Sequence, residues 1–533
     1  MSNGSASTYF LETFGCQMNI LDSQLVEGQL RARGMVPVPS FQQADLILFN
    51  TCSVRQHAED KVLSRLGELK ALKRRRPDAI LGVIGCMAER EKEGLFLKAP
   101  HVDLLCGPGE LNRLPALLDE VVARNEQLTA LTGAGSRRTE ALLRALEYDS
   151  LEALDLSRRP LEGENVLQSY IRVQRGCDKF CTYCVVPFTR GAERSRPPAH
   201  IVAEARTLAQ RGCREITLLG QTVNSYVYLE DGCAVPFARL LERVHEVEGI
   251  DRIRFVTSFP ADWDEDIFRV MRDFPRVMPY LHIPAQSGAD GVLKRMRRTY
   301  TADAYRRLMD TARLYVPHIA LAGDFIVGFC GETDAEHRES LRLVRDIEYS
   351  TLFVFRYSPR PGTAADRNQE DDVPDEVKAA RNAELLEAQR DISLRLRQNR
   401  IGSTLDVLIE GYSKLARKAQ GELGSAIRTR QMSSQTFRAA ALFDRDEPAQ
   451  ESEQDRGGEI SRQRSGQLVG RTPQDQIVVL DGPPEWIGGV ARVQIESATP
   501  QTLFGRVIEL TSPPRSAEPA PALHGGTSLP IVR

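Results

Sequence analysis

Three cysteines lie close together in the segment 175–191, RGCDKFCTYCVVPFTRG. They are Cys177, Cys181 and Cys184, spaced as C-x3-C-x2-C, and no fourth cysteine joins them. A closed structural metal site needs four ligands, whereas three thiolates can hold three irons of a [4Fe–4S] cluster and leave the fourth iron open. An open iron can bind a ligand from outside the protein, so this spacing indicates a catalytic cluster.

Cys16, Cys52 and Cys86 are far apart along the chain but stand in matching positions. Each follows a short apolar run, namely YFLETFG, ADLILFNT and AILGVIG. If these runs are parallel strands of one sheet, their carboxyl ends meet at the edge where open α/β sheets build their sites. We therefore expect the three thiols to form a second three-thiolate cluster site. For any one of them alone, an ordinary buried cysteine would be the simpler interpretation.

The elements expected to position this second set alternate over residues 8–125. Amphipathic stretches such as DSQLVEGQLRARG and AEDKVLSRLGELKALKRRR separate the apolar runs. Such alternation predicts a parallel sheet covered by helices on both faces, here a flavodoxin-like α/β domain. Residues 126–165 lose this rhythm, and we expect a linker that contains one helix.

The rest of the chain predicts two further domains. Residues 166–398 hold about six strand–helix units, which predict a complete or partial (β/α) barrel whose first strand precedes the C-x3-C-x2-C motif. Short strands over 401–510 predict a small antiparallel β-barrel. A polar insertion at 418–466 interrupts this barrel, and we expect the insertion and the tail 511–533 to be disordered.

Composition limits the class of protein only loosely. The 533-residue chain has 70 Lys and Arg against 73 Asp and Glu, so its net charge of −3 neither indicates nor excludes a nucleic-acid partner. The start MSNGSAS lacks the regions of a secretory signal, and no apolar run is long enough to span a bilayer. We therefore expect a cytoplasmic protein without membrane contact, in which the ten cysteines are metal ligands or buried thiols rather than disulfides.

The motif C-x3-C-x2-C at the first strand of a (β/α) barrel resembles the radical S-adenosylmethionine (SAM) superfamily. With the three distant cysteines, residues 8–510 are similar to the methylthiotransferase family of that superfamily, of the MiaB type. The segments that carry the resemblance are TFGCQMN, NTCSVRQHAEDK, GCMAER, QRGCDKFCTYCVVPFTRG, LHIPAQSG, GDFIVGFCGET and YSPRPGT. The C-terminal segments VLIEG, LVGRT and VARVQI resemble a TRAM RNA-binding domain.

The resemblance implies a radical SAM α/β enzyme with two [4Fe–4S] clusters that uses two SAM molecules per turnover. In the family, the cluster on the C-x3-C-x2-C cysteines binds SAM and yields a 5′-deoxyadenosyl radical, while the other cluster provides a sulfur that a second SAM methylates. The implied substrate is N6-isopentenyladenosine at position 37 of tRNA, beside the anticodon, which becomes the 2-methylthio derivative. A base in a single-stranded loop can leave its stack cheaply for such chemistry. The implied partners are the tRNA anticodon loop and a reductant such as flavodoxin or ferredoxin, and we expect a monomer.

Candidate SAM contacts are residues beside the cluster motif or at the ends of barrel strands, where polar groups suit ligand binding. They are Tyr183, Gln221, Asn224, Ser258, Gln286, Ser287 and Asp324. The polar ones could equally cap a following helix. Arg471 in the TRAM-like segment is a candidate phosphate contact. We expect no role for the remaining cysteines, which are Cys106, Cys213, Cys233 and Cys330, the last at a position where the family usually has proline.

Two other interpretations stay open. One is a methylthiotransferase with another substrate, either threonylcarbamoyl-adenosine in tRNA or an aspartate of a ribosomal protein. The other is a non-catalytic RNA-binding protein that uses its cysteines for structural zinc. His200 and Cys213 are the nearest further zinc ligands to the C-x3-C-x2-C motif, at spacings that match no familiar finger.

Overall fold

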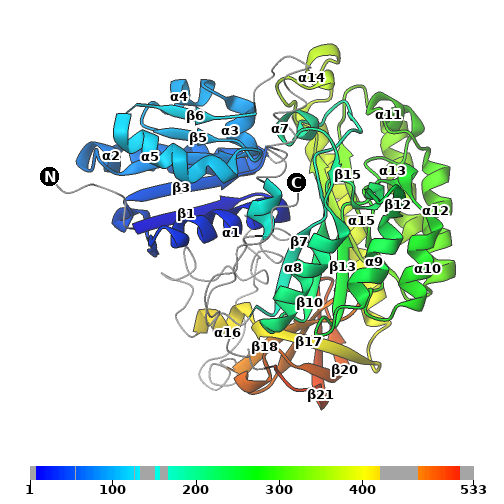
Figure 1. Cartoon of the computed structure of the whole chain (residues 1–533). Coiled ribbons are helices and arrows are strands. Elements are labelled where there is room, and N and C mark those ends of the chain that lie inside the picture. The colour runs from blue at the N-terminus through cyan, green and yellow to red at the C-terminus, as the bar shows by residue number, and fades with distance from the viewer. Residues whose placement is uncertain are drawn as a thin grey trace, which may run out of the picture.

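The computed structural model describes residues 8–53, 56–124, 126–132, 151–156, 166–419 and 466–515. These residues form three units, shown in Figure 1. An N-terminal α/β unit lies at the upper left, a central α/β unit occupies the right, and a small β-barrel lies below the central unit. In the described part of the chain, no helix is both long and apolar enough to cross a membrane.

The N-terminal unit is built on a six-stranded sheet in the order β2-β1-β3-β4-β5-β6, in which every neighbouring pair is parallel. Its first five strands follow the flavodoxin-like order, so the predicted fold class is confirmed here. Its elements are β1 (Thr8–Phe14), α1 (Gln17–Ala32), β2 (Val36–Pro37), β3 (Leu46–Thr51), α2 (Gln56–Arg75), β4 (Ile80–Gly85), α3 (Cys86–Glu91), α4 (Gly94–Lys98), β5 (Leu104–Cys106), α5 (Leu114–Arg124) and β6 (Leu128–Ala130). Because β6 pairs with β5, the sheet extends beyond residue 125 into the segment expected to be a linker.

Two apolar layers hold this sheet. β3 and β4 are buried at every residue, as expected for parallel strands covered on both sides. Alternate side chains point to opposite faces, so Leu46 and Leu48 belong to the layer under α1 and α5. Ile47 and Phe49 belong to the layer under α2 and α3. The packing on both faces keeps the carboxyl ends of neighbouring strands at one edge of the sheet.

The central unit contains six parallel barrel strands in chain order. Its elements are β7 (Gln168–Arg172), β8 (Gln174–Arg175), α7 (Val186–Thr189), β9 (Arg194–Ser195), α8 (Pro198–Gln210), β10 (Glu215–Leu219), β11 (Val227–Glu230), β12 (Cys233–Pro236), α9 (Phe237–His245), β13 (Arg252–Val256), α10 (Glu265–Asp273), β14 (Tyr280–His282), α11 (Asp290–Arg295), α12 (Ala302–Tyr315), β15 (Ala320–Val327), α13 (Asp334–Ile347), β16 (Thr351–Arg356), α14 (Ala364–Asn368) and α15 (Asp375–Gln398).

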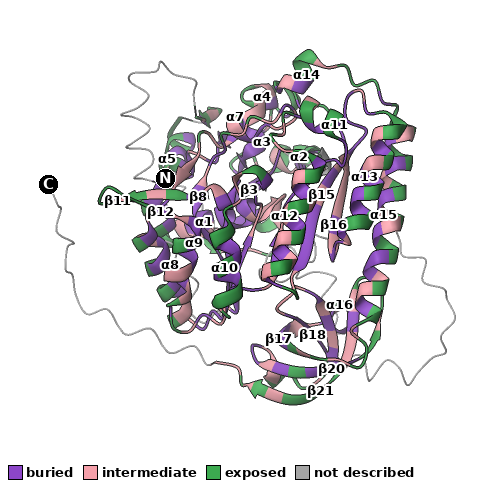
Figure 2. Ribbon diagram, turned by 90° about the vertical axis from the view of Figure 1, so that its right-hand side faces the viewer, coloured by how far each residue is buried: buried purple, intermediate pink, exposed green. Residues whose placement is uncertain are grey.

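These strands form a partial barrel. They pair as β7-β10-β13 and β14-β15-β16, and the halves meet where Ile253 bridges Val277 and where the amide of Ser258 donates to the carbonyl of His282 at 3.3 Å. Among the described strands, β7 and β16 each pair on one side only, so the barrel is open there. Helices α8, α9, α10, α12, α13 and α15 pack on its outside and turn their exposed faces to solvent (Figure 2).

The C-terminal unit is a closed five-stranded barrel in the order β17-β18-β19-β21-β20. Its neighbours are antiparallel except for β19 and β21, which pair in parallel. The elements are β17 (Thr404–Tyr412), α16 (Lys414–Ala419), β18 (Gln467–Arg471), β19 (Ile477–Asp481), β20 (Val490–Ala498) and β21 (Thr502–Ser512). The predicted insertion 418–466 and tail 511–533 lie almost wholly outside the described residues.

Candidate active site

The first cysteine set lies on three neighbouring strands at nearly the same register. Phe14 of β1, Thr51 of β3 and Gly85 of β4 are aligned partners across the sheet. Cys52 and Cys86 come directly after their aligned residues, and Cys16 comes two residues after Phe14. The amide of Cys52 also donates to the carbonyl of Phe14 at 3.0 Å. All three thiols therefore belong to one edge of the sheet, at the switch point between β1 and β3 where such folds bind ligands.

Glycines let the thiol-bearing turns approach each other. Gly15 has φ +135° and Gly85 has φ +91°, conformations that side chains rarely adopt. A Cβ at Gly15 would overlap the Cβ of Cys52, so no other residue leaves room there. The thiol of Cys16 donates to Oδ1 of Asn19 at 3.2 Å, and burial raises the pKa of Cys86.

The second set lies in the loop between β8 and α7. The amide of Cys177 donates to the carbonyl of Gly191 at 3.1 Å, and the amide of Cys184 donates to the carbonyl of Cys181 at 3.1 Å. The loop starts at Gly176 (φ +70°), where a Cβ would overlap the carbonyl of Ala192. Burial raises the pKa of Cys177 to about 11 and that of Cys184 to about 12, and each is raised further by Cys181. The three thiols thus act on one another electrostatically.

The donor set fits an iron–sulfur cluster better than a single metal ion. In the described ranges, no group of three His, Cys, Asp or Glu side chains surrounds the position of one ion. A zinc ion needs its ligands at about 2.0 to 2.3 Å. The thiolates of a [4Fe–4S] cluster bind separate irons and so lie farther apart. Three cysteine thiols at each site suit that arrangement.

A buried joint holds the two cysteine sets in a fixed relation. Met18 and Leu21 of α1 share an apolar cluster with Tyr170 of β7. Asp22 of α1 is fully buried and pairs with two arginines of the central unit, Arg172 and Arg190. Helix α7, which follows the second set directly, packs against α3, whose first residue is Cys86. The two thiol-bearing edges therefore meet at the contact between the units.

Some of the predicted SAM contacts have side chains that are hydrogen-bonded within the protein. Asn224 binds both backbone polar groups of Phe259, at 2.9 and 2.7 Å, so it holds the loop after β13. Ser287 is occupied as well, because its hydroxyl accepts from the amide of Ala289 and contacts Ser340. These hydrogen bonds hold the loops at the mouth of the barrel.

Ser258 and Asp324 have polar atoms at the mouth of the barrel that suit a ligand. The hydroxyl of Ser258 is buried without a hydrogen-bond partner among the described residues. One oxygen of Asp324 lies 3.2 Å from Nε2 of His282, whose Nδ1 is likewise buried without a partner. Gln286 has φ +68° and is tied through its backbone to Asp324. Unpartnered buried polar atoms at the ends of barrel strands suit a polar ligand.

The remaining two predicted contacts differ in their surroundings. Tyr183 packs edge-on against Phe329, with ring centroids 6.2 Å apart, and burial raises the pKa of its hydroxyl. Gln221 is half-buried after β10.

Sequence reasoning missed Arg298. Its Nη1 donates to Sγ of Cys181 at 3.3 Å, and its guanidinium stacks over the rings of Phe259 and Tyr300 at 4.5 and 5.1 Å. The only signal was a basic run after the strand end LHIPAQSG, which the pattern alone did not connect to the cysteines. A hydrogen bond from the amide of Thr182 to the carbonyl of Met296 brings the segment with Arg298 beside the cysteine loop.

The candidate phosphate contact Arg471 lies in a buried ionic contact. Its side chain is 5% exposed and faces Glu410 at 3.5 Å and Asp475 at 3.4 Å. Its carbonyl accepts from Arg252 at 2.7 Å, within the contact that joins the small barrel to the central unit. Arg471 therefore belongs to a buried ionic joint, because the strand that carries it faces the neighbouring unit rather than solvent.

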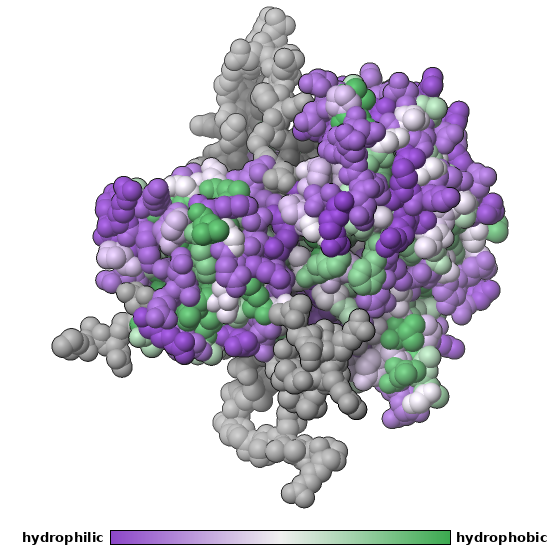
Figure 3. Space-filling model, turned by 90° about the horizontal axis from the view of Figure 1, so that it is seen from above, coloured by the Kyte–Doolittle hydropathy of each residue, from purple (hydrophilic) through white to green (hydrophobic). Residues whose placement is uncertain are grey.

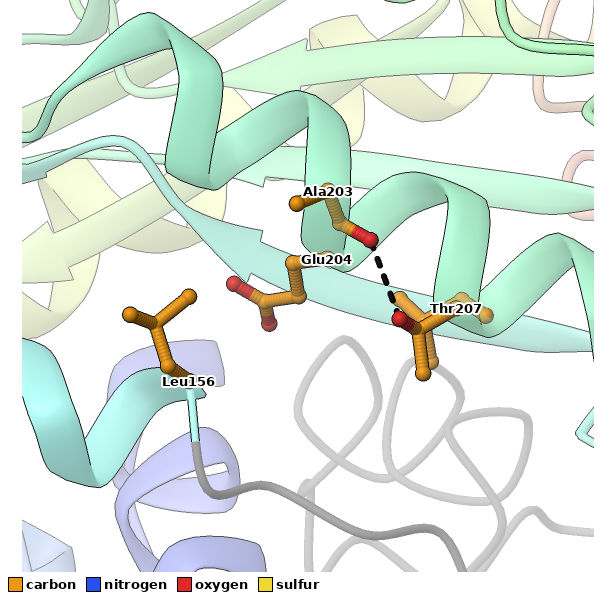
Figure 4. A pocket seen from close by; sticks show the side chains of 5 residues that line it. Leu156, Ala203, Glu204 and Thr207 are labelled. Atoms are coloured by element: carbon orange, nitrogen blue, oxygen red, sulfur yellow. Dashed lines mark hydrogen bonds between the residues drawn. The ribbon is translucent and has the colours of Figure 1, made fainter. Parts of the chain in front are cut away.

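Of the other cysteines, Cys330 shares an apolar cluster with Phe329, against which Tyr183 packs. Cys106, Cys213 and Cys330 are buried, and Cys233 is exposed. A small pocket lies between the helical segment 151–156 and α8, as Figure 4 shows. It is lined by Leu156, Ala203, Glu204, Thr207 and Leu208, and the Thr207 hydroxyl is satisfied by the carbonyl of Ala203 at 3.0 Å. It contains no cysteine and none of the predicted SAM contacts.

Three family models match the chain. Residues 8–107 match the uncharacterized protein family UPF0004, residues 171–344 match the radical SAM superfamily, and residues 459–508 match the TRAM domain. The matches fall on the three units of the fold in the same order.

Similar proteins cover nearly the whole chain. A protein of Rhodopirellula baltica is 42% identical over 94% of this chain and 95% of its own length. A protein of Protochlamydia amoebophila is 43% identical over 76% of this chain and 86% of its own. Both are named tRNA-2-methylthio-N(6)-dimethylallyladenosine synthase. Among solved structures, the radical SAM methyltransferase TsrM of Kitasatospora setae is similar with a TM-score of 0.49 and 14% identity, over 68% of this chain and 77% of that one.

Proposed function

The chain belongs to the family of tRNA-2-methylthio-N(6)-dimethylallyladenosine synthases, and from this we propose that it adds a methylthio group to carbon 2 of N6-dimethylallyladenosine at position 37 of tRNA. It is a radical SAM enzyme, which implies a [4Fe–4S] cluster and SAM. The observation that carries the proposal is the meeting of two three-cysteine sites at one contact between two units.

We assign one cluster to each site. Cys177, Cys181 and Cys184 hold the cluster whose bound SAM supplies a 5′-deoxyadenosyl radical, a species that no protein side chain can generate. Arg298 donates to Cys181, and the hydroxyl of Ser258, which has no partner within the described part of the chain, is available to SAM at the barrel mouth. Cys16, Cys52 and Cys86 hold the second cluster, which is the source of the inserted sulfur. Two SAM molecules are then used per turnover.

Two exposed aromatic rings beside both sites suit a single-stranded RNA loop. Phe180 is 48% exposed and Phe188 is 57% exposed, and their rings meet edge-on with centroids 6.3 Å apart. Phe180 precedes Cys181 directly, and Phe188 lies on α7, which packs against α3. Stacking of an unstacked base on such a ring is worth about 1 to 3 kcal/mol. The tRNA anticodon loop supplies bases of this kind.

The test uses anaerobically reconstituted protein, SAM, a reductant and tRNAs that differ only at position 37. With dimethylallyladenosine we expect the 2-methylthio product, detected by mass spectrometry of the nucleosides, together with 5′-deoxyadenosine. The triple variant Cys177→Ala, Cys181→Ala, Cys184→Ala should form neither. The triple variant Cys16→Ala, Cys52→Ala, Cys86→Ala should form 5′-deoxyadenosine only. Product on threonylcarbamoyl-adenosine tRNA instead would replace the substrate proposed here.

The matched control is Cys233→Ala, because Cys233 is an exposed cysteine on β12, away from both sites. It should retain both products and the full iron content. The two relatives compared above both carry the synthase name. They therefore favour neither a methylthiotransferase with another substrate nor a zinc-containing RNA-binding protein.

A further inference from the structure

Two cations that act on the first cysteine set belong to a different unit of the fold. Arg190 is the second-to-last residue of the segment RGCDKFCTYCVVPFTRG, and Arg360 lies in YSPRPGT after β16. Both are in the central unit, whereas Cys16, Cys52 and Cys86 are in the N-terminal unit. We propose that Arg190 and Arg360 are positioning residues for the cluster on these three cysteines, so that docking of the central unit sets the charge around it and its reduction potential. The inference rests on the proposed function.

Arg190 is held in place by an ion pair with Asp22. Its side chain is 7% exposed, and Nη2 lies 2.8 Å from Oδ2 of the fully buried Asp22. It is a hydrogen-bond partner of the Cys86 side chain, and its charge also acts on Cys16. Asp22 is shared with Arg172, which also faces Asp155 at 3.6 Å, so the Asp22 carboxylate does not serve Arg190 alone.

Arg360, which follows β16 in the central unit, also interacts electrostatically with this cysteine set. It is buried, and its charge acts on Cys52 and on Glu59. Glu59 is 3% exposed and already has a partner in its own unit, because Arg90 lies 2.9 Å from its carboxylate. Arg360 is therefore a second cation from the central unit whose charge acts on the cysteine set.

Charge balance explains why these cations matter. Three thiolates and an iron–sulfur core in a buried place carry net negative charge, which is costly to bury without a counterion. Hydrogen bonds to cluster sulfurs and nearby positive charge stabilise the reduced form, which raises the reduction potential. The N-terminal unit alone would hold the thiols, but its cluster would lack these two cations.

The experiment isolates this cluster in the full chain. The variant Cys177→Ala, Cys181→Ala, Cys184→Ala removes the second site, and a redox titration followed by electron paramagnetic resonance measures the potential of what remains. Adding Arg190→Gln or Arg360→Gln should shift the midpoint to more negative potential. Arg190→Lys should give a smaller shift, because the charge is kept and the planar fork is lost. The matched control is Arg298→Gln, which removes a cation that contacts the other set and should leave this midpoint unchanged.

The outcomes separate the inference from the proposed function. If the variant without Cys177, Cys181 and Cys184 binds no cluster, the two-cluster assignment fails. If it binds four irons and neither Gln variant shifts the midpoint, the inference fails while the proposed function stands. If the arginines have only a structural role, the Gln and Lys variants should lose iron equally. The midpoint potential of the clusters that still form would then not move. This result would also overturn the inference.

Discussion

Replacing Asp22 by asparagine should loosen the joint that brings the two cysteine sets together. The Asp22 carboxylate lies on α1, is fully buried and pairs with Arg172 and Arg190 of the central unit. Asparagine keeps the shape of the side chain and loses its charge. Two guanidinium groups, each less than 8% exposed, would then lose their shared partner.

The size of the effect follows from the burial of the pair. Removing one partner of a buried ion pair costs about 3 to 5 kcal/mol, because the other charge stays buried without compensation. Arg172 keeps a second carboxylate, that of Asp155, at 3.6 Å. We therefore expect the lower end, about 3 kcal/mol. Since about 1.4 kcal/mol is a factor of ten in an equilibrium constant, the population with an opened joint should rise about a hundredfold.

The assay is hydrogen–deuterium exchange of the α1 and β7 amides in the cluster-loaded protein under anaerobic conditions, because exchange reports local opening. The control is Asp119→Asn, which breaks an exposed pair with Arg33 on the same domain. Exposed pairs are worth about 0 to 1 kcal/mol, so exchange should barely change in the control. Unchanged exchange at α1 and β7 in Asp22→Asn, or an equal change in Asp119→Asn, would refute the reasoning.

Three further predictions test other parts of the molecule. Cys52→Ala should still cleave SAM to 5′-deoxyadenosine but form no methylthio product, both measured by mass spectrometry. Burial raises the pKa of Glu89 from 4.5 to about 7, so the folded form keeps a proton that the unfolded chain releases. Stability should therefore fall as pH rises from 4.5 to 7 and then level, and Glu89→Gln should reduce this slope in denaturation midpoints measured at pH 5 and 8. Phe188→Leu should raise KM for tRNA about five- to hundredfold with kcat little changed, since a base loses about 1 to 3 kcal/mol of stacking.

Each of these has a result that would contradict it. Methylthio product from Cys52→Ala would remove Cys52 from the sulfur-donating site. An equal pH slope in Glu89→Gln and the parent protein would mean that Glu89 does not titrate in this range. For Phe188 the control is Phe188→Tyr, which keeps an aromatic face. A KM raised equally in the Tyr and Leu variants would exclude stacking as the cause.

The hydrophobicity of the surface does not mark the candidate site. Figure 3, seen from above, shows a largely hydrophilic surface on which hydrophobic groups are scattered in small patches. Exposed aromatics such as Phe180 and Phe188 stand out only once their place beside the cysteine loop is known. Sequence reasoning named the stretch that contains them but assigned them no role.

Several features could be predicted because they are local or periodic. The spacing of Cys177, Cys181 and Cys184 places the thiols on one loop whatever the rest of the fold does. The apolar runs before Cys16 and Cys52 predict parallel strands, and parallel strands end at one edge. The order of the three units and the fold class followed from the same patterns, and the structure and family matches agree with both.

Other features depend on contacts between distant segments, which no local pattern encodes. Asp22 and Arg190 are 168 residues apart, and Arg252 and Arg471 are 219 apart. Arg471 looked like a phosphate contact in its motif, yet tertiary packing buries it against Glu410.

The sequence by itself determined which residues are candidates for the chemistry, because thiol type, motif spacing and strand periodicity are properties of short segments. Only the tertiary structure decided how these segments face one another: that α1 docks on β7 through Asp22, and that Arg190 reaches the thiols of another unit. The physical reason is that burial and charge pairing act through space. A buried carboxylate or thiol is compensated by whichever cation the fold brings beside it, however far away that cation lies in the chain.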